Sequence, residues 1–344
     1  MTSNDALLTV RDLVVQFRTM DGVVRAVDGV SFTVDEGEIL GVVGESGSGK
    51  SVTVMSVLGL IPQPPGKVAG GSALFRGSDL LRASKRQLRQ VRGEEIGMIF
   101  QDPMTALNPV MKVGKQIAEA IRIHHKSTSS AAALDRAVEL LQLVGVPQPE
   151  ERVHQYPHEF SGGMRQRAVI AMAIANDPDL LIADEPTTAL DVTIQAQVLD
   201  MLRRAQAETG AATIFITHDL GVVAELAERV IVMYAGRIME QGTVRSIFTA
   251  PRHPYTVGLL RSLPSLKHDA TTLTPIPGSP PNLLAPAPGC PFQPRCEVGR
   301  DRDVCATERP HLTEVAAGHT SACHFAGEVG SLMPVTGGVG EVAR

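Results

Sequence analysis

One stretch decides the fold of this chain: Gly44-Glu45-Ser46-Gly47-Ser48-Gly49-Lys50-Ser51. It fits the pattern G-x-x-x-x-G-K-[ST], a glycine-rich turn that joins a strand to a helix. The apolar run 39–43 just before it predicts a buried strand, and 52–60 just after it predicts a buried helix. Both elements that the motif requires are present, which favours a phosphate-binding loop over an ordinary Gly/Ser turn.

Such a loop would hold a nucleoside triphosphate. Backbone N–H groups around the turn point at a phosphate, and the positive end of the following helix adds attraction. Lys50 would reach the β- and γ-phosphates, and the Ser51 hydroxyl would bind Mg²⁺. The residues expected to contact the nucleotide are Gly44, Glu45, Ser46, Gly47, Ser48, Gly49, Lys50, Ser51 and Val52.

Composition sets limits on the remaining possibilities. A length of 344 residues suggests about two domains, and 43% hydrophobic with 20% charged residues is ordinary for a globular protein. The net charge of −5 gives no overall electrostatic case for binding nucleic acid. No apolar stretch approaches the ~18–20 residues of a membrane span, and residues 1–5 do not begin a signal peptide. We expect a soluble, cytoplasmic chain whose membrane role, if any, comes through a partner.

Strand and helix patterns predict an α/β fold. Two β-rich runs, 7–17 and 23–34, precede the loop, and helical patterns dominate from about 110 to 176. Strands and helices then alternate, which indicates a mostly parallel sheet. Their order is 180–183, 193–208, 212–217, 219–227 and 230–234.

Domain boundaries follow from changes in composition. Pro, Thr and Ser become frequent over 275–288, and all four cysteines come later. We expect a nucleotide-binding domain at 1–250 with a helical subdomain at about 102–176. A small C-terminal extension at 251–330 and a flexible tail at 331–344 would follow.

Carboxylates follow a predicted strand at the edge where ligands bind in open α/β sheets. Asp184 and Glu185 come directly after 180–183, so one can hold Mg²⁺ through water and the other can polarise an attacking water. His218 follows the strand at 212–217 and could touch the γ-phosphate, although taken alone a surface histidine is favoured. Phe17 could equally stack on a purine or pack in a core.

A second anion-binding feature begins at Ser161, a good N-cap for the helix that follows. The N–H groups of Gly162 and Gly163 lie at this helix start and can attract an anion. The site is either a simple helix cap or a contact for a nucleotide held by another subunit.

Together these motifs resemble the nucleotide-binding subunit of an ATP-binding cassette (ABC) transporter, over about residues 7–250. The resemblance places the motifs in order, with Walker A at 44–51, the Q-loop glutamine at Gln101, the signature motif at Ser161-Gly162-Gly163-Met164, Walker B at 180–185, the D-loop at Ala189-Leu190-Asp191 and the switch histidine at His218. It makes Phe17 the adenine-stacking aromatic. Met164 replaces the usual Gln and Phe160 the frequent Leu, but neither change removes the backbone N–H groups.

The resemblance also implies a mechanism. Two cassettes would pack head to tail, with each ATP between one Walker A loop and the partner's signature motif. Glu185 would deprotonate water, His218 would contact the γ-phosphate, and Gln101 would join Mg²⁺ and water to the helical subdomain. Ser51 and Asp184 would complete the Mg²⁺ site. Closure and release of the dimer would move transmembrane partners.

Three further stretches look like the D-type ATPase subunit of oligopeptide/dipeptide importers: 101–109, 252–256 and 289–296. This resemblance implies a second ATPase subunit (suggesting a paralogue), two transmembrane permeases, an extracytoplasmic peptide-binding protein and a peripheral location at the cytoplasmic face of the cell membrane. Nickel importers share much of this sequence, so the cargo stays open. A soluble non-transport ABC ATPase is the other alternative. It would need a long coiled-coil insertion or a second cassette in the same chain, and the sequence shows neither pattern. Glu185 and His218 disfavour a non-catalytic subunit.

The cysteines are Cys290, Cys296, Cys305 and Cys323, spaced C-x5-C-x8-C-x17-C. Disulfides are disfavoured in the cytoplasm, so four clustered thiols indicate a shared metal. The spacing alone leaves zinc, an iron–sulfur cluster and unmetallated thiols open. Some ATPases that this chain resembles carry a [4Fe-4S] cluster at corresponding cysteines, which favours a structural cluster with zinc as the alternative.

Overall fold

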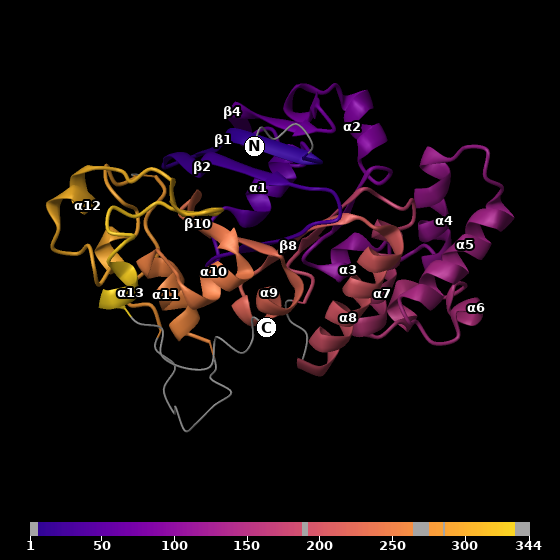
Figure 1. Ribbon diagram of the computed structural model, residues 1–344. Coiled ribbons are helices and arrows are strands. Elements are labelled where there is room, and N and C mark those ends of the chain that lie inside the picture. The colour runs from indigo at the N-terminus through magenta and orange to yellow at the C-terminus, as the bar shows by residue number, and fades with distance from the viewer. Residues whose placement is uncertain (1–5, 188–191, 264–274, 285, 334–344) are drawn as a thin grey trace. The chain divides into compact units, whose positions relative to one another are not determined.

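The computed structural model describes residues 6–187, 192–263, 275–284 and 286–333. These residues form two compact units (Figure 1). The loop unit comprises the described parts of Met1–Val34, Ile39–Leu81 and Thr217–Arg344, and the helical unit comprises Asp35–Glu38 and the described parts of Arg82–Ile216. Within the described ranges, no helix is long and apolar enough to cross a membrane.

The loop unit begins with an antiparallel sheet in the order β2-β1-β4-β5. Its strands are β1 (Leu8–Thr19), β2 (Gly22–Val34), β4 (Gly66–Phe75) and β5 (Ser78–Asp79). Alternate apolar side chains of β1, including Leu8, Val10, Leu13 and Val15, are buried, as expected for a strand with one covered face. The two β-rich runs predicted before the loop are confirmed.

A second sheet of the loop unit carries the phosphate loop. Its strands follow the order β11-β12-β10-β9-β3. Strand β3 (Ile39–Val43) pairs in parallel with β9 (Arg229–Tyr234), which pairs antiparallel with β10 (Arg237–Thr243). Helix α1 (Lys50–Val57) follows the loop and begins two residues before the predicted start, so Lys50 and Ser51 are its first residues. Helix α9 (Leu220–Leu226) contacts β3.

The C-terminal part of the loop unit adds short elements around this sheet. They are α10 (Val244–Thr249), α11 (Pro254–Arg261), the 3₁₀ turn η3 (Gln293–Arg295), α12 (Asp303–Thr307), β11 (Thr313–Ala316), β12 (His319–Ser321) and α13 (Val329–Leu332). Strand β12 pairs with β10, so the hairpin β11–β12 extends the sheet.

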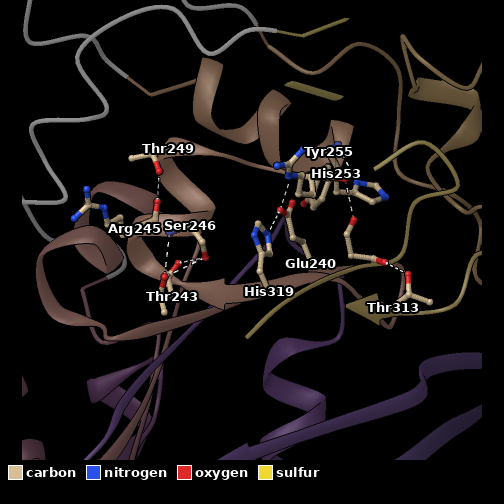
Figure 2. Close-up of polar contacts among 11 residues, drawn as sticks. Glu240, Thr243, Arg245, Ser246, Thr249, His253, Tyr255, Thr313 and His319 are labelled. Carbon is tan, nitrogen blue, oxygen red and sulfur yellow. Dashed lines mark hydrogen bonds and ion pairs between the residues drawn. The ribbon is translucent and has the colours of Figure 1, made fainter. Parts of the chain in front are cut away.

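A buried hydrogen bond between two side chains fastens this hairpin to β10. His319 Nε2 lies 2.7 Å from Glu240 Oε1, and the two side chains are 3% and 0% exposed (Figure 2). The N–H of Arg252 donates to the same carboxylate oxygen at 2.6 Å. Because a polar group is costly to bury without a hydrogen-bond partner, each side chain depends on the other.

The helical unit is built on parallel strands in the order β8-β7-β6. These are β6 (Ile96–Ile99), β7 (Leu180–Asp184) and β8 (Ala212–Thr217). Helix α2 (Lys85–Val91) precedes β6, and α8 (Val192–Thr209) joins β7 to β8. Between β6 and β7 the chain forms helices, namely α3 (Pro103–Ala106), α4 (Val113–His124), α5 (Ser130–Leu143), α6 (Pro149–Arg152) and α7 (Gly162–Ala173). Helices α4, α5 and α7 pack on one another.

The fold class is therefore the predicted one. Mostly parallel α/β strands, an antiparallel β sheet, a helical insertion and a cysteine-bearing C-terminal region are all present.

Candidate nucleotide site

The phosphate loop takes a backbone path that only glycine allows at two points. Gly44 has φ 151° and Gly49 has φ 101°. A Cβ at Gly44 would collide with the carbonyl oxygen of Met233, and one at Gly49 would lie 2.5 Å from the carbonyl oxygen of Ala26. The turn after β3 is thus as tight as the sequence pattern predicts.

The loop gathers positive charge and donors. Lys50 is 4% exposed, and its Nζ donates to the carbonyl oxygens of Gly44 at 2.8 Å and Glu45 at 3.1 Å. Gly49 is the N-cap of α1 and offers no side-chain cap to the helix N–H groups. Such groups attract an anion.

Space and an unsatisfied hydroxyl complete the fit to phosphate. Ser46 and Gly47 are exposed, and a Cβ at Gly47 would meet nothing within 4 Å. Among the residues that the structure describes, the buried Ser48 Oγ has no hydrogen-bond partner. Ser51 and Val52 are half-buried at the start of α1.

Phe17 lies near the end of β1, opposite Val24 of β2 and Gly66 of β4. Its side chain is half-buried and lies against Gly66, since a Cβ added to Gly66 would be 3.0 Å from Phe17 Cε1. The side chain is only partly covered, which leaves surface with which it could stack on a base.

In the helical unit, the structure brings together two residues that lie 84 positions apart. Gln101 Nε2 donates to Glu185 Oε2 at 3.1 Å. Asp184 is the buried last residue of β7, and Glu185 turns away with φ 46°, its N–H donating to Ile216 O at 2.9 Å. A left-handed conformation is uncommon for a residue other than glycine and is often found at functional sites.

His218 of the loop unit lies exposed between β8 and α9. On either side the chain is held in place, because the Asp219 N–H donates to Thr217 Oγ1 at 3.0 Å and Asp219 Oδ1 accepts from Gly221 N at 2.8 Å. The imidazole is thus presented at the end of a strand.

The second anion-binding feature is open to solvent. Ser161 is the N-cap of α7, as predicted, and its hydroxyl accepts from Met164 N at 3.3 Å. Ser161 and Gly162 are exposed, whereas Phe160 is buried. The N–H groups at this helix start are accessible to an external anion. Asp191, the predicted D-loop residue, lies outside the described residues.

The four cysteines line one pocket in the C-terminal region. Burial, together with a smaller effect of the neighbouring sulfurs, raises the pKa of Cys290 to about 11 and that of Cys323 to about 12. The predicted metal is not supported directly. In the described ranges, no group of three or more His, Cys, Asp or Glu side chains is placed to hold a metal ion.

One set of residues at the loop could not be predicted from the sequence. Arg295 Nη1 and Nη2 donate to Glu45 Oε2 and Oε1 at 2.6 and 2.9 Å, and Glu45 N donates to the Tyr255 hydroxyl at 2.8 Å. Arg295 and Tyr255 lie in the stretches 289–296 and 252–256, which stand out in the sequence only through their resemblance to a subfamily.

Strand β3, its glycine turn and the uncapped start of α1 define a P-loop nucleotide-binding protein. The family model "ABC transporter" matches residues 27–188, and the model "Oligopeptide/dipeptide transporter, C-terminal region" matches residues 239–305. The chain belongs to the ATP-binding proteins of the ABC transporter family, in its oligopeptide/dipeptide branch.

Individual relatives agree over nearly the whole chain. The oligopeptide transport ATP-binding protein OppD of Bacillus subtilis (strain 168) is 56% identical, covering 91% of this chain and 87% of its own. The dipeptide transport ATP-binding protein DppD of the same organism is 53% identical over 93% and 94%. A dimeric post-hydrolysis structure of the ATP-binding cassette MJ0796 bound to ADP and Pi superposes with a TM-score of 0.62 at 25% identity, covering 69% of this chain and 99% of that one.

Proposed function

We propose that this chain is the ATP-hydrolysing motor subunit of a bacterial ABC importer for di- or oligopeptides. The observation that carries the catalytic part is the hydrogen bond from Gln101 to Glu185 at the end of β7. It orients a carboxylate next to the buried Asp184, the arrangement that an attacking water and a metal-bound triphosphate require.

The residues divide the chemistry among them. The loop 44–51 with Val52 binds the phosphates, Lys50 neutralises them, and Phe17 stacks on adenine. Mg²⁺ would be held by Ser51, Asp184 and Gln101, and would neutralise charge on the phosphate oxygens. Glu185 takes a proton from water, and His218 contacts the γ-phosphate.

A second cassette completes the site. The exposed Ser161 and Gly162 support this, since a helix start open to solvent can meet a nucleotide on another subunit. Gly163 and Met164 would continue this contact, with Asp191 at the same interface. The partners would be a paralogous ATPase subunit, two transmembrane permeases and an extracytoplasmic peptide-binding protein, at the cytoplasmic face of the cell membrane.

Peptide cargo is supported by the C-terminal match at 239–305 and by the names of the relatives. The domain division proposed with it is a cassette at 1–250, including a helical subdomain at about 102–176, an extension at 251–330 and a tail at 331–344. A nickel importer of the same superfamily is the second candidate for cargo.

The cysteine pocket would hold a structural [4Fe-4S] cluster, with zinc as the alternative. Gly299 N donates to Cys296 Sγ at 3.1 Å, and backbone N–H groups also face Cys290 and Cys323, where they favour the thiolate. A single zinc ion would need all four sulfurs to lie about 2.3 Å from one point. A [4Fe-4S] cluster is larger and holds its four cysteine sulfurs further apart. Iron, sulfide and zinc analysis of the full chain, purified anaerobically, tests this. Zinc alone, or no metal, would rule the cluster out.

Glu185→Gln tests the motor role. In transporter reconstituted with its permeases and binding protein, we expect intact ATP binding with ATP hydrolysis and uptake of a labelled peptide lost. The matched control is Glu208→Gln, an exposed glutamate of α8. Hydrolysis at the wild-type rate in Glu185→Gln would contradict the catalytic assignment, and uptake of Ni²⁺ but not peptide by the wild type would favour the nickel importer.

A further inference from the structure

The first residue after Gly44 in the phosphate loop is an acid whose every polar group is engaged. The Glu45 carboxylate is held by both terminal nitrogens of Arg295, its N–H by the Tyr255 hydroxyl, and its carbonyl oxygen by Lys50 Nζ. The carbonyl also accepts from Ser48 N at 3.2 Å. Two of these partners, Arg295 and Tyr255, come from the C-terminal region.

Arg295 is itself rigidly held. Its side chain is 5% exposed, against 26% for Glu45. Nε donates to Pro277 O at 2.8 Å, Nη1 donates also to the Tyr234 hydroxyl at 3.2 Å, and the guanidinium lies against the rings of Tyr234 and Phe292. A bidentate, preorganised pair of this kind fixes the position of the Glu45 side chain and also neutralises its charge.

The negative charge of Glu45 makes this contact important for nucleotide binding. A carboxylate in the phosphate loop repels a triphosphate, and the repulsion is strong at short range where water is partly excluded. Arg295 cancels that charge and at the same time fixes the loop's first turn. The free loop therefore keeps its N–H groups aimed before the nucleotide arrives.

We propose that Arg295 of the C-terminal region is a positioning residue for ATP binding, acting through Glu45. It rests on the nucleotide binding proposed above, and it gives the C-terminal region a part in that binding. The turn η3 that carries Arg295 lies between two cysteines, since Gln293 N donates to Cys290 O and Cys296 N donates to Gln293 O, each at 3.1 Å. The short turn η3 thus lies beside the cysteine pocket and also contacts the phosphate loop through Arg295.

Arg295→Gln is the first test. We expect the Kd of the full chain for Mg-ATP to rise about tenfold, the scale of a lost charged hydrogen bond. In the reconstituted transporter the KM for ATP should rise with it, while kcat at saturating ATP stays within about twofold, because Arg295 acts on binding and not on the reacting atoms. Added salt should reduce the difference in Kd between Arg295→Gln and the wild type, since it screens the charge of the unpaired Glu45.

The double variant separates positioning from general folding. Glu45→Gln alone should weaken binding less than Arg295→Gln, because the charge then left unpaired is the positive one of Arg295, which does not repel the phosphates. Arg295→Gln/Glu45→Gln should bind like Glu45→Gln alone. If Arg295 only supported the fold, the double variant would bind no better than Arg295→Gln, and that result overturns the proposal. If Arg295→Gln fails to fold, Arg295→Lys, which loses the bidentate contact with Glu45, tests the same pair, and unchanged ATP affinity overturns the proposal.

A matched control is Arg309→Gln. Arg309 also comes from the C-terminal region and pairs at 2.9 Å with Asp28 of β2. Its loss should leave ATP affinity unchanged, and equal weakening by Arg309→Gln and Arg295→Gln would refute a specific role. Failure of the wild type to bind Mg-ATP would refute the proposed function, whereas normal binding by both wild type and Arg295→Gln refutes only this inference.

Discussion

The phosphate loop and the C-terminal region are held by different kinds of interaction. The loop's shape comes from a short run of neighbouring residues, with Gly44 and Gly49 in conformations that glycine alone adopts easily. The C-terminal region is fastened by pairs far apart in sequence, Arg295 with Glu45 over 250 positions and His319 with Glu240 over 79. Local backbone geometry can be read from a motif. Long-range pairing cannot, because 32 Lys and Arg could each meet any of 37 Asp and Glu.

The largest expected effect lies in the loop. In Gly44→Ala the new Cβ would collide with the Met233 carbonyl, so the turn must move and the N–H groups lose their aim. Backbone strain alone costs about 1–3 kcal/mol, and with the collision we expect the Kd for Mg-ATP to rise at least about 100-fold. Equilibrium binding to the full chain measures it.

Gly70→Ala is the control for that variant. Gly70 lies in β4 of the same unit, and an added Cβ would only reach ordinary contact with Val14 at 4.0 Å. Its ATP affinity should equal that of the wild type. Normal ATP binding by Gly44→Ala would show that the loop tolerates what its geometry forbids.

The second effect tests the C-terminal region by stability. In Glu240→Ala, the buried His319 loses its hydrogen-bond partner, and we expect about 1–3 kcal/mol lower free energy of unfolding for the loop unit. Urea unfolding monitored by circular dichroism measures the change. Glu240→Gln, which keeps hydrogen-bonding oxygen and volume, should lose less, and exposed Glu314→Ala of β11 should change little. Equal losses in Glu240→Ala and Glu314→Ala would argue against a buried pair that stabilises this region.

Sequence patterns predicted the regular elements well and the C-terminal hairpin poorly. The strand at 39–43 is found as β3, and the helical patterns predicted from about 110 to 176 are found as helices that include α4 and α5. Strands β10 and β12 were not predicted, because short polar runs such as Glu240-Gln241-Gly242 lack an apolar alternation.

Site residues divide along the same line. The loop, the Asp184-Glu185 turn and Ser161 stand out in the sequence because each follows a strand or begins a helix. The family resemblance pointed to Gln101, but its contact with Glu185 came from the structure. Arg295 also came from the structure alone, since its role depends on which acid lies opposite.

A third prediction concerns Phe17, for which the sequence left two interpretations. Phe17→Ala should weaken Mg-ATP binding by about 1–3 kcal/mol if the ring stacks on adenine, and Phe17→Tyr should restore it. The matched control is Phe75→Leu, a buried aromatic of β4, which should lower stability and leave affinity unchanged. Weaker binding of inorganic triphosphate by Phe17→Ala would point instead to a displaced loop, because that ligand has no base.

The smallest expected effect is at Ser161 and separates a helix cap from a nucleotide contact. Ser161→Ala removes the oxygen that accepts from Met164 N and should cost about 1 kcal/mol of stability. Ser161→Asp caps the helix as well as serine does and should restore that stability. Its negative charge would nevertheless face a triphosphate brought by a second cassette.

Ser161→Ala and Ser161→Asp should therefore differ in ATP-driven pairing of cassettes. Size-exclusion chromatography of the hydrolysis-deficient Glu185→Gln background with Mg-ATP measures ATP-driven pairing of cassettes. We expect Ser161→Ala to pair nearly normally and Ser161→Asp to remain unpaired, although it is the more stable protein. If Ser161→Asp pairs like the wild type, no phosphate approaches the start of α7, and the exposed Ser161 and Gly162 are simply the solvated end of a helix.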